Sequence, residues 1–466
     1  DTPLENVTLK LTDLSSSSAS ISASNLDWAQ QGYVYLTPNG YYEPKLEGWA
    51  PDPLLRDVSS GILVPADTSQ PLMITVCVAA DTQPGNYSGT AHLTTASGWA
   101  LVVPISLTVW NITLPSLSSP GAFGGAWTFG DANMNDFYPD FFTPDSPSKK
   151  SWYDFVAAHR IPADDLYLNQ PRSIDEYKLL AASGAGMMNL IDVTNLPGGG
   201  RKTNYSADYV TALLDTLTPA VEAMQKAGLA DKAYVYGFDE TPQVNMPGVY
   251  QLFGAVKGKW PWLTTVATLN WQVMPGDLPV DIWVQQYELY NETKVAGWKA
   301  ANHTYWNYHC ISPRGPNDLN GFIERPAIHL RQLFWLAALR DVSGWLYYEV
   351  DIWARGNLLA NASHTYHRLN ATARIDFPAS SWPQAGQQLG ANGDGSYTYP
   401  GPQPTGTIRL TNIRDGIEDV ELLRMLPLDV RQPLISKMVT DHDTHVDDPN
   451  LLVSLRAAAA AAVMQR

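Results

Sequence analysis

The stretch Tyr234-Val-Tyr-Gly-Phe-Asp-Glu-Thr-Pro242 is the point around which the chain is organised. Its aromatic and β-branched residues predict a short strand, and Pro242 cannot continue a strand ladder, so the chain turns there. Successive strand residues point to opposite faces, so Asp239 and Glu240 can share one cavity only where the strand ends. Catalytic groups of α/β barrels lie at such C-terminal strand ends. The stretch therefore predicts a paired-carboxylate site at the mouth of a barrel.

Strand-like and helix-like segments alternate on both sides of this stretch. Strands are expected at 121–129, 165–168, 187–193, 234–240, 264–269, 281–286, 303–311 and 344–350. A helix at 209–226 keeps its apolar residues at the 3.6-residue period, and another is expected at 325–339. Eight strands that alternate with helices are typical of a (β/α)8 barrel, so the fold class is α/β with a TIM-like barrel.

The region before the barrel is expected to be all-β. Short alternating runs at 72–78 and 101–110 are separated by turn-rich pieces such as Pro84-Gly-Asn86. This pattern predicts an N-terminal β-sandwich domain at 1–117, followed by the barrel with a C-terminal helical extension at 118–466. A Pro/Ser connector at 114–120 marks the boundary. We interpret the sandwich as a support or as a module that contacts glycans.

Two further segments lie after the eighth expected strand. Residues 376–404 are rich in Gly, Pro and Ser and predict a long loop on the side of the barrel mouth. Residues 451–464 are rich in alanine and predict a helix on the outside of the barrel.

Composition narrows the class of protein. The 466 residues include 46 acids against 30 bases, without a basic cluster, so nucleic-acid binding has no electrostatic basis. No apolar run approaches the roughly 20 residues that span a bilayer. N-glycosylation sequons occur at Asn6, Asn86, Asn111, Asn204, Asn291, Asn302, Asn361 and Asn370. The chain begins at Asp1 without a visible signal peptide, so we expect a mature protein of the secretory pathway, secreted or lysosome-like.

The sequence contains no recognisable motif for binding a metal or a cofactor. The nine histidines show neither His-x-x-x-His nor Glu-x-x-His spacing, so zinc has little support, and we expect no metal and no cofactor. A Gly-x-Ser-x-Gly turn for a serine nucleophile is also absent. Cys77 and Cys310 do not make a disulfide framework. A bridge between the two domains and two free, buried thiols are both open.

The adjacency of the two carboxylates indicates a particular chemistry. Ordinary glycosidase pairs flank the scissile bond from opposite faces, whereas sequence neighbours approach it from one side. That arrangement suits substrate-assisted catalysis, in which the 2-acetamido oxygen of the sugar is the nucleophile. Asp239 would stay ionised and support the acetamido group, and Glu240, with a raised pKa, would be the acid/base. The alternative is structural, because Asp-Glu-Thr-Pro also resembles a helix N-terminus whose acids favour the dipole.

Several motifs, taken in order, resemble the β-N-acetylgalactosaminidases of glycoside hydrolase family 123 and related sandwich-plus-barrel proteins. They run over nearly the whole chain: Pro84-Gly-Asn-Tyr-Ser-Gly89, Leu107-Thr-Val-Trp-Asn-Ile-Thr-Leu-Pro115, Tyr236-Gly-Phe-Asp-Glu-Thr-Pro242, Trp306-Asn-Tyr-His-Cys-Ile-Ser-Pro313, Arg331 with Trp335, Gly344-Trp-Leu-Tyr-Tyr348 and Ile413-Arg-Asp-Gly-Ile-Glu-Asp419. The family's catalytic pair falls on Asp239 and Glu240. The resemblance implies retaining, exo-acting release of terminal β-linked N-acetylgalactosamine, with glycolipid-type glycans among the substrates.

One departure and several weaker candidates surround this pair. The eighth strand ends in Leu346-Tyr-Tyr348, where the family pattern has a Leu-Tyr-Trp-like ending, so the sugar contacts there stay open. Carbohydrate contacts are expected from side chains at or near strand ends, namely Asn270, Trp271, Tyr287, Trp306, Tyr308, Tyr348 and Trp353. If Tyr308 faces inward, it could bond the acetamido oxygen, although Trp306 and Tyr308 fit barrel packing equally well.

Two other functions stay open at this stage. One is a catalytically silent glycan-binding protein on the same scaffold, against which the intact Asp239-Glu240 pair argues. The other is a glycosidase for another sugar with a remote nucleophile such as Asp192 or Glu349.

Overall fold

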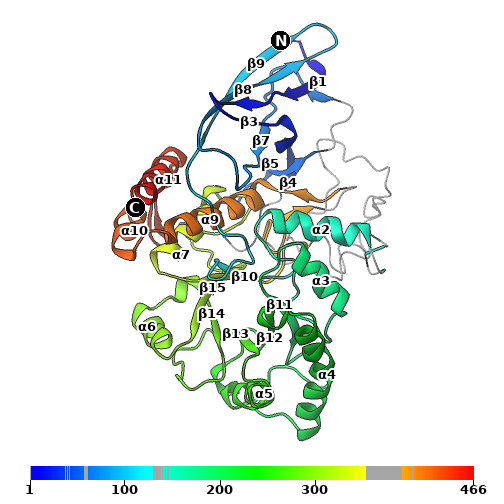
Figure 1. Cartoon of the computed structure of the whole chain (residues 1–466), viewed down its shortest axis with the longest axis vertical. Helices are drawn as coiled ribbons and strands as arrows, with labels where there is room; N and C mark the ends of the chain where they lie inside the picture. Colours follow the sequence, from blue (N-terminus) through cyan, green and yellow to red (C-terminus); the bar gives the residue numbers. More distant parts are fainter. Residues whose placement is uncertain are drawn as a thin grey trace.

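The N-terminal region is all-β, as expected, and lies at the top of the view in Figure 1. The computed structural model describes residues 2–36, 38, 40, 42–56, 61–129, 138, 140–141, 143, 146–352, 391–399 and 403–466. The N-terminal strands are β1 (Leu4–Leu11), β2 (Leu14–Ser15), β3 (Ser20–Ile21), β4 (Leu26–Leu36), β5 (Gly48–Leu55), β6 (Ile62–Val64), β7 (Leu72–Val76), β8 (Gly85–Thr94) and β9 (Ala100–Val109).

These strands form two antiparallel sheets. One has the order β3-β2-β8-β1-β6 with β9 paired to β8, and the other has the order β5-β4-β7. Leu14 and Tyr87 of the first sheet share a core with Leu26 of the second, because alternate residues of both sheets face inward. Pro104 lies on β9 opposite Thr90, at a sheet edge where its missing N–H is tolerated.

The second part is a parallel, nearly closed barrel surrounded by helices. Its strands are β10 (Gly124–Trp127), β11 (Met188–Asp192), β12 (Ala233–Gly237), β13 (Thr264–Thr268), β14 (Ile282–Gln286), β15 (Thr304–Tyr308) and β16 (Gly344–Tyr347). They form a seven-stranded sheet in the order β10-β16-β15-β14-β13-β12-β11. Every neighbouring pair is parallel, which confirms the TIM-like α/β fold class.

The eighth barrel position differs from the expected strand at 165–168. The chain there makes one parallel bridge, between Thr128 and Asp164, instead of a ladder. Two backbone bonds remain, from the Phe129 N–H to the Asp164 carbonyl and from the Asp192 N–H to the Leu168 carbonyl, each at 2.8 Å. Between them the Asn189 amide donates to the carbonyls of Asp165 (2.9 Å) and Leu166 (3.0 Å), and the Asp164 side chain accepts from the Asn189 backbone N–H. The barrel therefore closes here through a mixture of backbone and side-chain hydrogen bonds, and a strand pattern in the sequence does not reveal the side-chain part.

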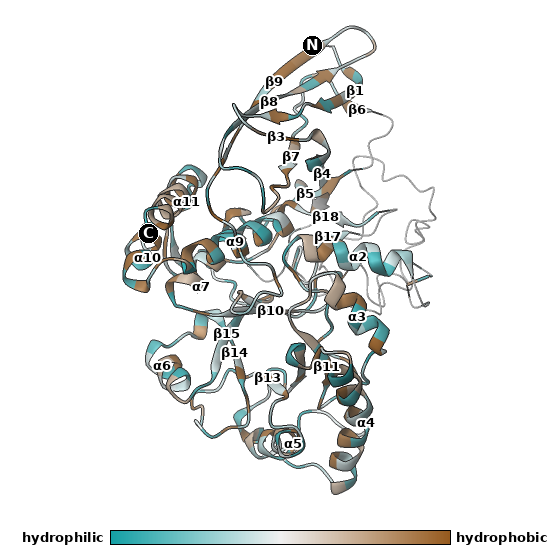
Figure 2. Cartoon of the chain, in the orientation of Figure 1, coloured by the Kyte–Doolittle hydropathy of each residue, from teal (hydrophilic) through white to brown (hydrophobic). Residues whose placement is uncertain are grey.

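Helices cover the outside of the barrel. They are α2 (Pro147–Ala158), α3 (Ile174–Ala182), α4 (Ala207–Lys226), α5 (Met246–Lys259), α6 (Glu292–Ala300), α7 (Ile328–Leu339), α9 (Ile408–Arg424), α10 (Leu428–Ile435) and α11 (Pro449–Met464). Figure 2 shows both hydrophobic and hydrophilic segments on α4, whose Leu213, Leu217 and Val221 are fully buried. The Ser206 side chain caps α4 by accepting from the Tyr209 N–H. The expected helices at 209–226 and 451–464 are thus confirmed as α4 and α11.

Two short hairpins lie near the C-terminal helices. One pairs β17 (Thr398–Tyr399) with β18 (Thr405–Gly406), and the other pairs β19 (Val439–Asp441) with β20 (Thr444–His445). Most of the loop predicted at 376–404 lies outside the described residues, as do Trp353, Asn361 and Asn370.

A buried ion pair joins the antiparallel sheets to the barrel. Asp52 of β5 is bound by Arg409 of α9 in a two-pronged contact of 2.7 and 2.9 Å, and Tyr399 donates to the same carboxylate at 2.7 Å. The side chains of Asp52 and Arg409 are 0% and 3% exposed. The division of the chain at residue 117 stays a prediction, since this contact crosses it.

Three surface expectations can be compared with the structure. All six described sequon asparagines are exposed: Asn6, Asn86, Asn111, Asn204, Asn291 and Asn302. Cys77 and Cys310 are both free, and Cys77 is exposed, so neither a bridge nor a pair of buried thiols is found. Among the described helices, none combines the length and the apolarity needed to cross a bilayer.

Candidate active site

The carboxylate pair follows β12 at the C-terminal end of the barrel. Phe238 and Glu240 have φ angles of +58° and +48°, a region that side chains other than glycine rarely adopt. The Phe238 ring is held between Tyr205 and Phe253, and the Glu240 N–H donates to the Thr268 carbonyl at 2.9 Å. Surrounding packing therefore stabilises a strained backbone, a feature that clusters at functional sites.

Asp239 is held by a phenol and a guanidinium. Tyr236 donates to Oδ1 and Arg201 to Oδ2, each at 2.9 Å. Burial raises the pKa of Asp239, while the Tyr236 hydrogen bond and the Arg201 charge lower it and the Glu240 charge raises it again. The net direction is upward, because the strand end buries the carboxylate in the mouth, and the expectation that Asp239 stays ionised remains a prediction.

Glu240 lies at the more open side of the mouth. The residue is exposed, so the burial expected for the acid/base is not present in the free protein. The Tyr308 hydroxyl makes a short hydrogen bond to Oε1 of Glu240, and the Asn270 amide donates to that hydroxyl at 2.6 Å. Asn270 is fixed in turn by accepting from the Gln286 N–H at 3.0 Å. Asn270 and Tyr308, two expected sugar contacts, therefore orient Glu240 from the ends of β13 and β15, which lie on the two sides of β14.

More acidic groups surround the mouth. Burial raises the pKa of Tyr167, and the charges of Asp239, Asp192 and Glu349 raise it further. Tyr167 packs edge to face on Tyr236 with ring centroids 6.1 Å apart. Sequence analysis missed Tyr167, although it stands in the expected second strand at 165–168. Its phenol, which these carboxylates keep protonated, adds a hydrogen-bond donor to the mouth.

Asp192 ends β11 on the same side of the mouth as Asp239. Its Oδ1 accepts from the N–H (2.8 Å) and the hydroxyl (2.6 Å) of Thr194. Burial raises the pKa of Asp192 to about 7, with the Asp239 charge adding to the effect and Thr194 opposing it. A carboxyl group that holds its proton near neutral pH is thus present beside the pair.

The end of β16 contributes a second polar cluster. The hydroxyls of Tyr347 and Tyr348 donate to the two oxygens of Asp394 at 3.1 and 2.8 Å. Burial raises the pKa of Asp394 to about 6, and these two hydrogen bonds oppose it. Burial likewise raises the pKa of Cys310, and the charges of Asp394 and Glu240 contribute. Tyr348, an expected contact, is therefore tied to residues beyond 390.

Two expected contacts are part of the core instead. Tyr287 is fully buried against Trp345 and bonds the Leu319 carbonyl, so it lies behind the mouth. The Trp271 ring is 4% exposed, and its N–H is donated to the Thr241 carbonyl at 2.6 Å. Both residues follow a strand end, but their rings turn outward under the covering helices.

A third expected contact, Trp306, fills the inside of the barrel. Its ring lies over Gly124 and Gly344, where an added Cβ would come within 2.4 and 2.3 Å of it. The ring can occupy this place because the neighbouring strand β16 and the strand beyond it, β10, each begin with a glycine. Trp353 lies outside the described residues and stays a prediction.

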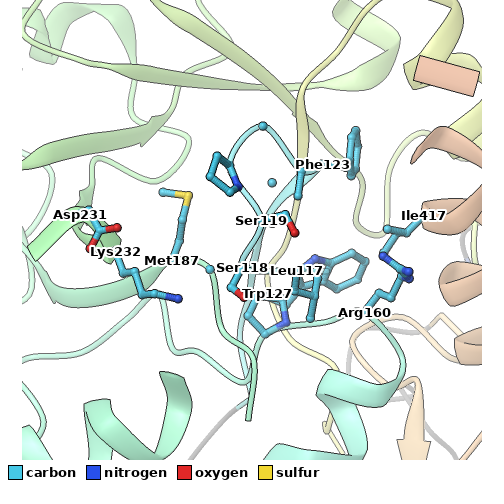
Figure 3. Close-up of a pocket in the computed structure, with 17 residues that line it drawn as sticks. Leu117, Ser118, Ser119, Phe123, Trp127, Arg160, Met187, Asp231, Lys232 and Ile417 are labelled. Carbon is cyan, nitrogen blue, oxygen red and sulfur yellow. The ribbon is translucent and has the colours of Figure 1, made fainter. Parts of the chain in front are cut away.

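A cavity of about 290 Å³ lies at the opposite end of the barrel (Figure 3). Its lining comes from residues that precede or begin the strands, including Gly124 of β10, Met187 before β11 and Lys232 before β12. Lys232 there donates to the Ala185 carbonyl at 2.9 Å. The catalytic chemistry of such barrels lies at the other face, so the carboxylate mouth is the candidate active site.

Comparison with known proteins supports this assignment. Residues 199–426, which include the pair, match the family described as "Glycoside hydrolase 123, catalytic domain". Among curated proteins, none matches the chain. A solved family 123 glycoside hydrolase from Clostridium perfringens, whose study concerns glycolipid glycan hydrolysis, superposes over 100% of this chain and 90% of its own with a TM-score of 0.72 at 13% identity. That likeness shows a shared fold.

Other solved structures are far less similar. A β-glucuronidase from Ruminococcus gnavus has a TM-score of 0.33 at 10% identity and covers 72% of this chain and 63% of its own. A β-D-glucuronidase from Dictyoglomus thermophilum has a TM-score of 0.33 at 10% identity and covers 75% and 70%. A similarity this low does not bear on the function of this chain. The assignment of the active site rests on the family match that spans Asp239 and Glu240. Residues 199–426 are therefore a glycoside hydrolase family 123 catalytic domain.

Proposed function

We propose that this chain is a retaining exo-hydrolase that releases terminal β-linked N-acetylgalactosamine by substrate-assisted catalysis. The observation that carries the proposal is the position of Asp239 and Glu240, which are adjacent and lie on one side of the barrel mouth. An ordinary retaining pair flanks the anomeric carbon from two sides. A pair that approaches from one side instead fits a substrate that brings its own nucleophile.

The chemistry follows from the two carboxylates. Asp239 accepts the acetamido N–H while the acetamido oxygen attacks the anomeric carbon, and Glu240 gives its proton to the leaving oxygen as the glycosidic bond breaks. The product is an oxazolinium ion, whose positive charge the Asp239 carboxylate offsets. Water then attacks the anomeric carbon and gives a proton to Glu240, so the released sugar keeps its configuration.

The partners of each carboxylate favour this division of roles. Arg201 and Tyr236 both stabilise the charged form of Asp239, which the supporting group requires. Tyr308 and Asn270 fix the orientation of Glu240 while leaving the residue open to the incoming sugar. A bound sugar would cover Glu240, exclude water and so raise its pKa in the complex, as an acid/base needs.

The upward pKa of Asp239 favours one alternative, in which the two carboxylates exchange roles. Leaving-group dependence separates the two assignments. If Glu240 is the acid, Glu240→Gln loses far more activity on an aryl glycoside with a poor leaving group than on one with a good leaving group, and Asp239→Asn loses activity on both alike. The reverse pattern assigns the acid role to Asp239.

Hydrolysis of three aryl glycosides tests the function itself. The substrates are aryl β-N-acetylgalactosaminide, β-N-acetylglucosaminide and β-galactoside, with a thiazoline analogue of the oxazolinium ion as inhibitor. Fast release of N-acetylgalactosamine that the thiazoline blocks supports the proposal. Release from the β-galactoside would contradict it and favour a remote nucleophile such as Asp192, which is buried beside Asp239. No release from any of the three would favour a silent glycan-binding protein.

Glycolipid glycans are the natural substrates we propose. The supporting observation is the similarity to the Clostridium perfringens hydrolase, which shares the fold over the full chain. Release of the terminal sugar from a glycosphingolipid, compared with a soluble oligosaccharide of the same sequence, tests this point. A strong preference for the soluble glycan would contradict it.

We also propose that the protein passes through the secretory pathway, secreted or lysosome-like, and carries N-glycans. The exposure of all six described sequon asparagines is compatible with modification. A fall in apparent mass after treatment with an amidase that removes N-glycans checks this in protein from the native source.

A further inference from the structure

A cluster of two histidines and one aspartate lies outside the barrel, where α7 begins beside the β19–β20 hairpin. The ligand atoms of His329, His445 and Asp447 lie within 4.8 Å of one another. His329 Nε2 is 3.1 Å from one oxygen of Asp447, and His445 Nδ1 is 2.8 Å from the other. The expectation of no metal rested on short spacings, and here the two histidines come from distant parts of the chain.

Both ring nitrogens of His445 face oxygen acceptors, and a neutral imidazole has only one N–H to donate. Its Nε2 is 2.8 Å from the Asn317 carbonyl, which only accepts, so Nε2 carries the proton of the neutral form. Nδ1 then has a lone pair that faces a carboxylate oxygen at 2.8 Å. Two acceptors this close require a second proton or a cation between them. A histidine with its outer N–H on a backbone carbonyl is the usual arrangement of a metal ligand.

His329 is available as the second nitrogen ligand. Its side chain is 3% exposed, and its Nε2 is 3.1 Å from the Asp447 carboxylate. Among the described residues, Nδ1 of His329 has no hydrogen-bond partner. Nothing there fixes the proton on one nitrogen, so Nε2 can present its lone pair toward Asp447.

The donors are close enough to converge on a small divalent ion. Metal–ligand bonds of about 2.0–2.1 Å in a tetrahedral site give ligand–ligand edges of about 3.3 Å. The two oxygens of Asp447 are 3.1 and 2.8 Å from the two imidazoles, and the three ligand atoms lie within 4.8 Å of one another, so an ion that binds would draw the most distant pair together. The Asp447 side chain is 39% exposed, so water can take the fourth position.

The cluster stands on a fixed backbone. Gln332 of α7 donates to the Val446 carbonyl at 2.8 Å, and the Val446 N–H donates to the Met438 carbonyl at 2.9 Å. Val446 lies between His445 and Asp447, so both ligands are positioned before any ion binds. Sites held in this way lose little entropy on binding.

We propose that His329, His445 and Asp447 bind one divalent transition-metal ion of the zinc class, which links the β19–β20 hairpin to α7. Two imidazoles with one carboxylate are ligands that zinc accepts in a tetrahedral site. The hairpin also contacts the segment after β15, because the Leu319 N–H donates to the His442 carbonyl at 2.8 Å. The ion would therefore stabilise the side of the barrel that supports Tyr308.

Zinc titration of the full chain, stripped with a chelator and dialysed, tests the proposal. Calorimetry should show one Zn²⁺ per chain, and the melting temperature should rise by several degrees in excess Zn²⁺. Asp447→Asn and His445→Asn should each weaken Zn²⁺ binding at least about tenfold, because the loss of a contact in a metal site typically lowers the affinity by this factor or more. Co²⁺ in the same site should give the intense visible absorption of a tetrahedral complex.

A neighbouring pair supplies the matched control. His442 Nδ1 is 2.8 Å from Asp318 in the same hairpin region, but no second histidine converges on that pair among the described residues. His442→Asn and Glu240→Gln should leave Zn²⁺ binding unchanged. If the unaltered chain binds Zn²⁺ no more tightly than His445→Asn, or if Co²⁺ gives no tetrahedral spectrum, a second proton on His445 explains the geometry and the proposal is wrong.

Discussion

Asp239 at the barrel mouth and Asp419 on α9 are both aspartates bound by arginine, yet their surroundings differ. The Asp419 side chain is 0% exposed and accepts from Arg331 at 2.6 and 3.1 Å and from Arg456 at 2.6 Å. Asp239 is 24% exposed and meets one guanidinium, that of Arg201, which is itself 46% exposed.

The two carboxylates differ in how much of their hydrogen-bond acceptor capacity is already used by protein donors. Asp419 also accepts from the Trp335 N–H at 2.8 Å, so both of its oxygens are saturated by protein donors. Asp239 has two donors, one of them on an exposed side chain, and stands next to a second carboxylate. A saturated carboxylate stabilises the fold, whereas an unsaturated one beside a like charge is available to a substrate.

The strongest test of this contrast is Glu240→Gln, which removes the proposed proton donor. We expect kcat/KM on a poor-leaving-group glycoside to fall by about 10³-fold, about 4 kcal/mol, as is typical of lost general acid catalysis. Unfolding by urea should be unchanged. Glu222→Gln, at an exposed position on α4, is the control and should keep full activity. Near-normal activity of Glu240→Gln would remove this residue from the mechanism.

Asp419→Asn tests the other side of the comparison. It leaves Arg331 and Arg456 facing a neutral amide, and we expect the free energy of unfolding to fall by about 3 kcal/mol. Asp175→Asn is the control, because Asp175 pairs with Lys178 at a surface where both side chains are more than half exposed. Its effect should stay below about 1 kcal/mol. If Asp419→Asn and Asp175→Asn lowered the free energy of urea unfolding equally, the stabilising role of the saturated Asp419 carboxylate would be contradicted.

The pH dependence of stability separates the mouth from the saturated site. The pKa of Asp192 is raised to about 7 in the folded chain, so its contribution is present at acid pH and is lost as pH rises toward 7. Asp192→Asn keeps an acceptor for Thr194 but cannot ionise. Relative to the unaltered chain, the variant should gain about 3 kcal/mol between about pH 4 and about pH 7. A difference that stays constant over this range in urea unfolding would contradict the buried, protonated state.

The smallest effect is expected from Arg201→Gln. Loss of the guanidinium removes a cause that lowers the pKa of Asp239, so the acid limb of the kcat/KM profile should move to higher pH. Because this ion pair is partly exposed, the activity lost at acid pH should be about threefold. Arg201→Lys should recover most of it. An unchanged acid limb would show that Arg201 does not act on Asp239 during catalysis.

Much of the architecture could be predicted because it depends on local patterns. The strand that ends in Asp239, the period of α4 and the alternation of barrel strands are all visible in short windows of sequence. The segment at 165–168 could not be assigned correctly, because part of its hydrogen bonding comes from the side chain of Asn189, which lies more than twenty residues away. A pattern method has no access to such substitutions of side chain for backbone.

The site was predicted in part for a similar reason. Asp239 and Glu240 are adjacent, and Asn270 and Tyr308 lie at the ends of β13 and β15, which both pair with β14, so topology brings them together. Arg201 reaches Asp239 from the connection between β11 and α4, and no motif in the sequence indicates that these two side chains form an ion pair. Trp306 fits beneath the mouth because of glycines on two other strands, which become its neighbours only once the strand order is known.

The pairing of Asp52 with Arg409 has a consequence for how the protein can be divided. Removing the antiparallel sheets would take away Asp52 and leave the Arg409 guanidinium buried among the carbonyls of Gly321, Gly393 and Ser396 without the carboxylate that it pairs with. The barrel is therefore not a module that can be excised or grafted onto another protein by cutting at the connector. A domain exchange between related proteins would have to transfer Asp52 and Arg409 together.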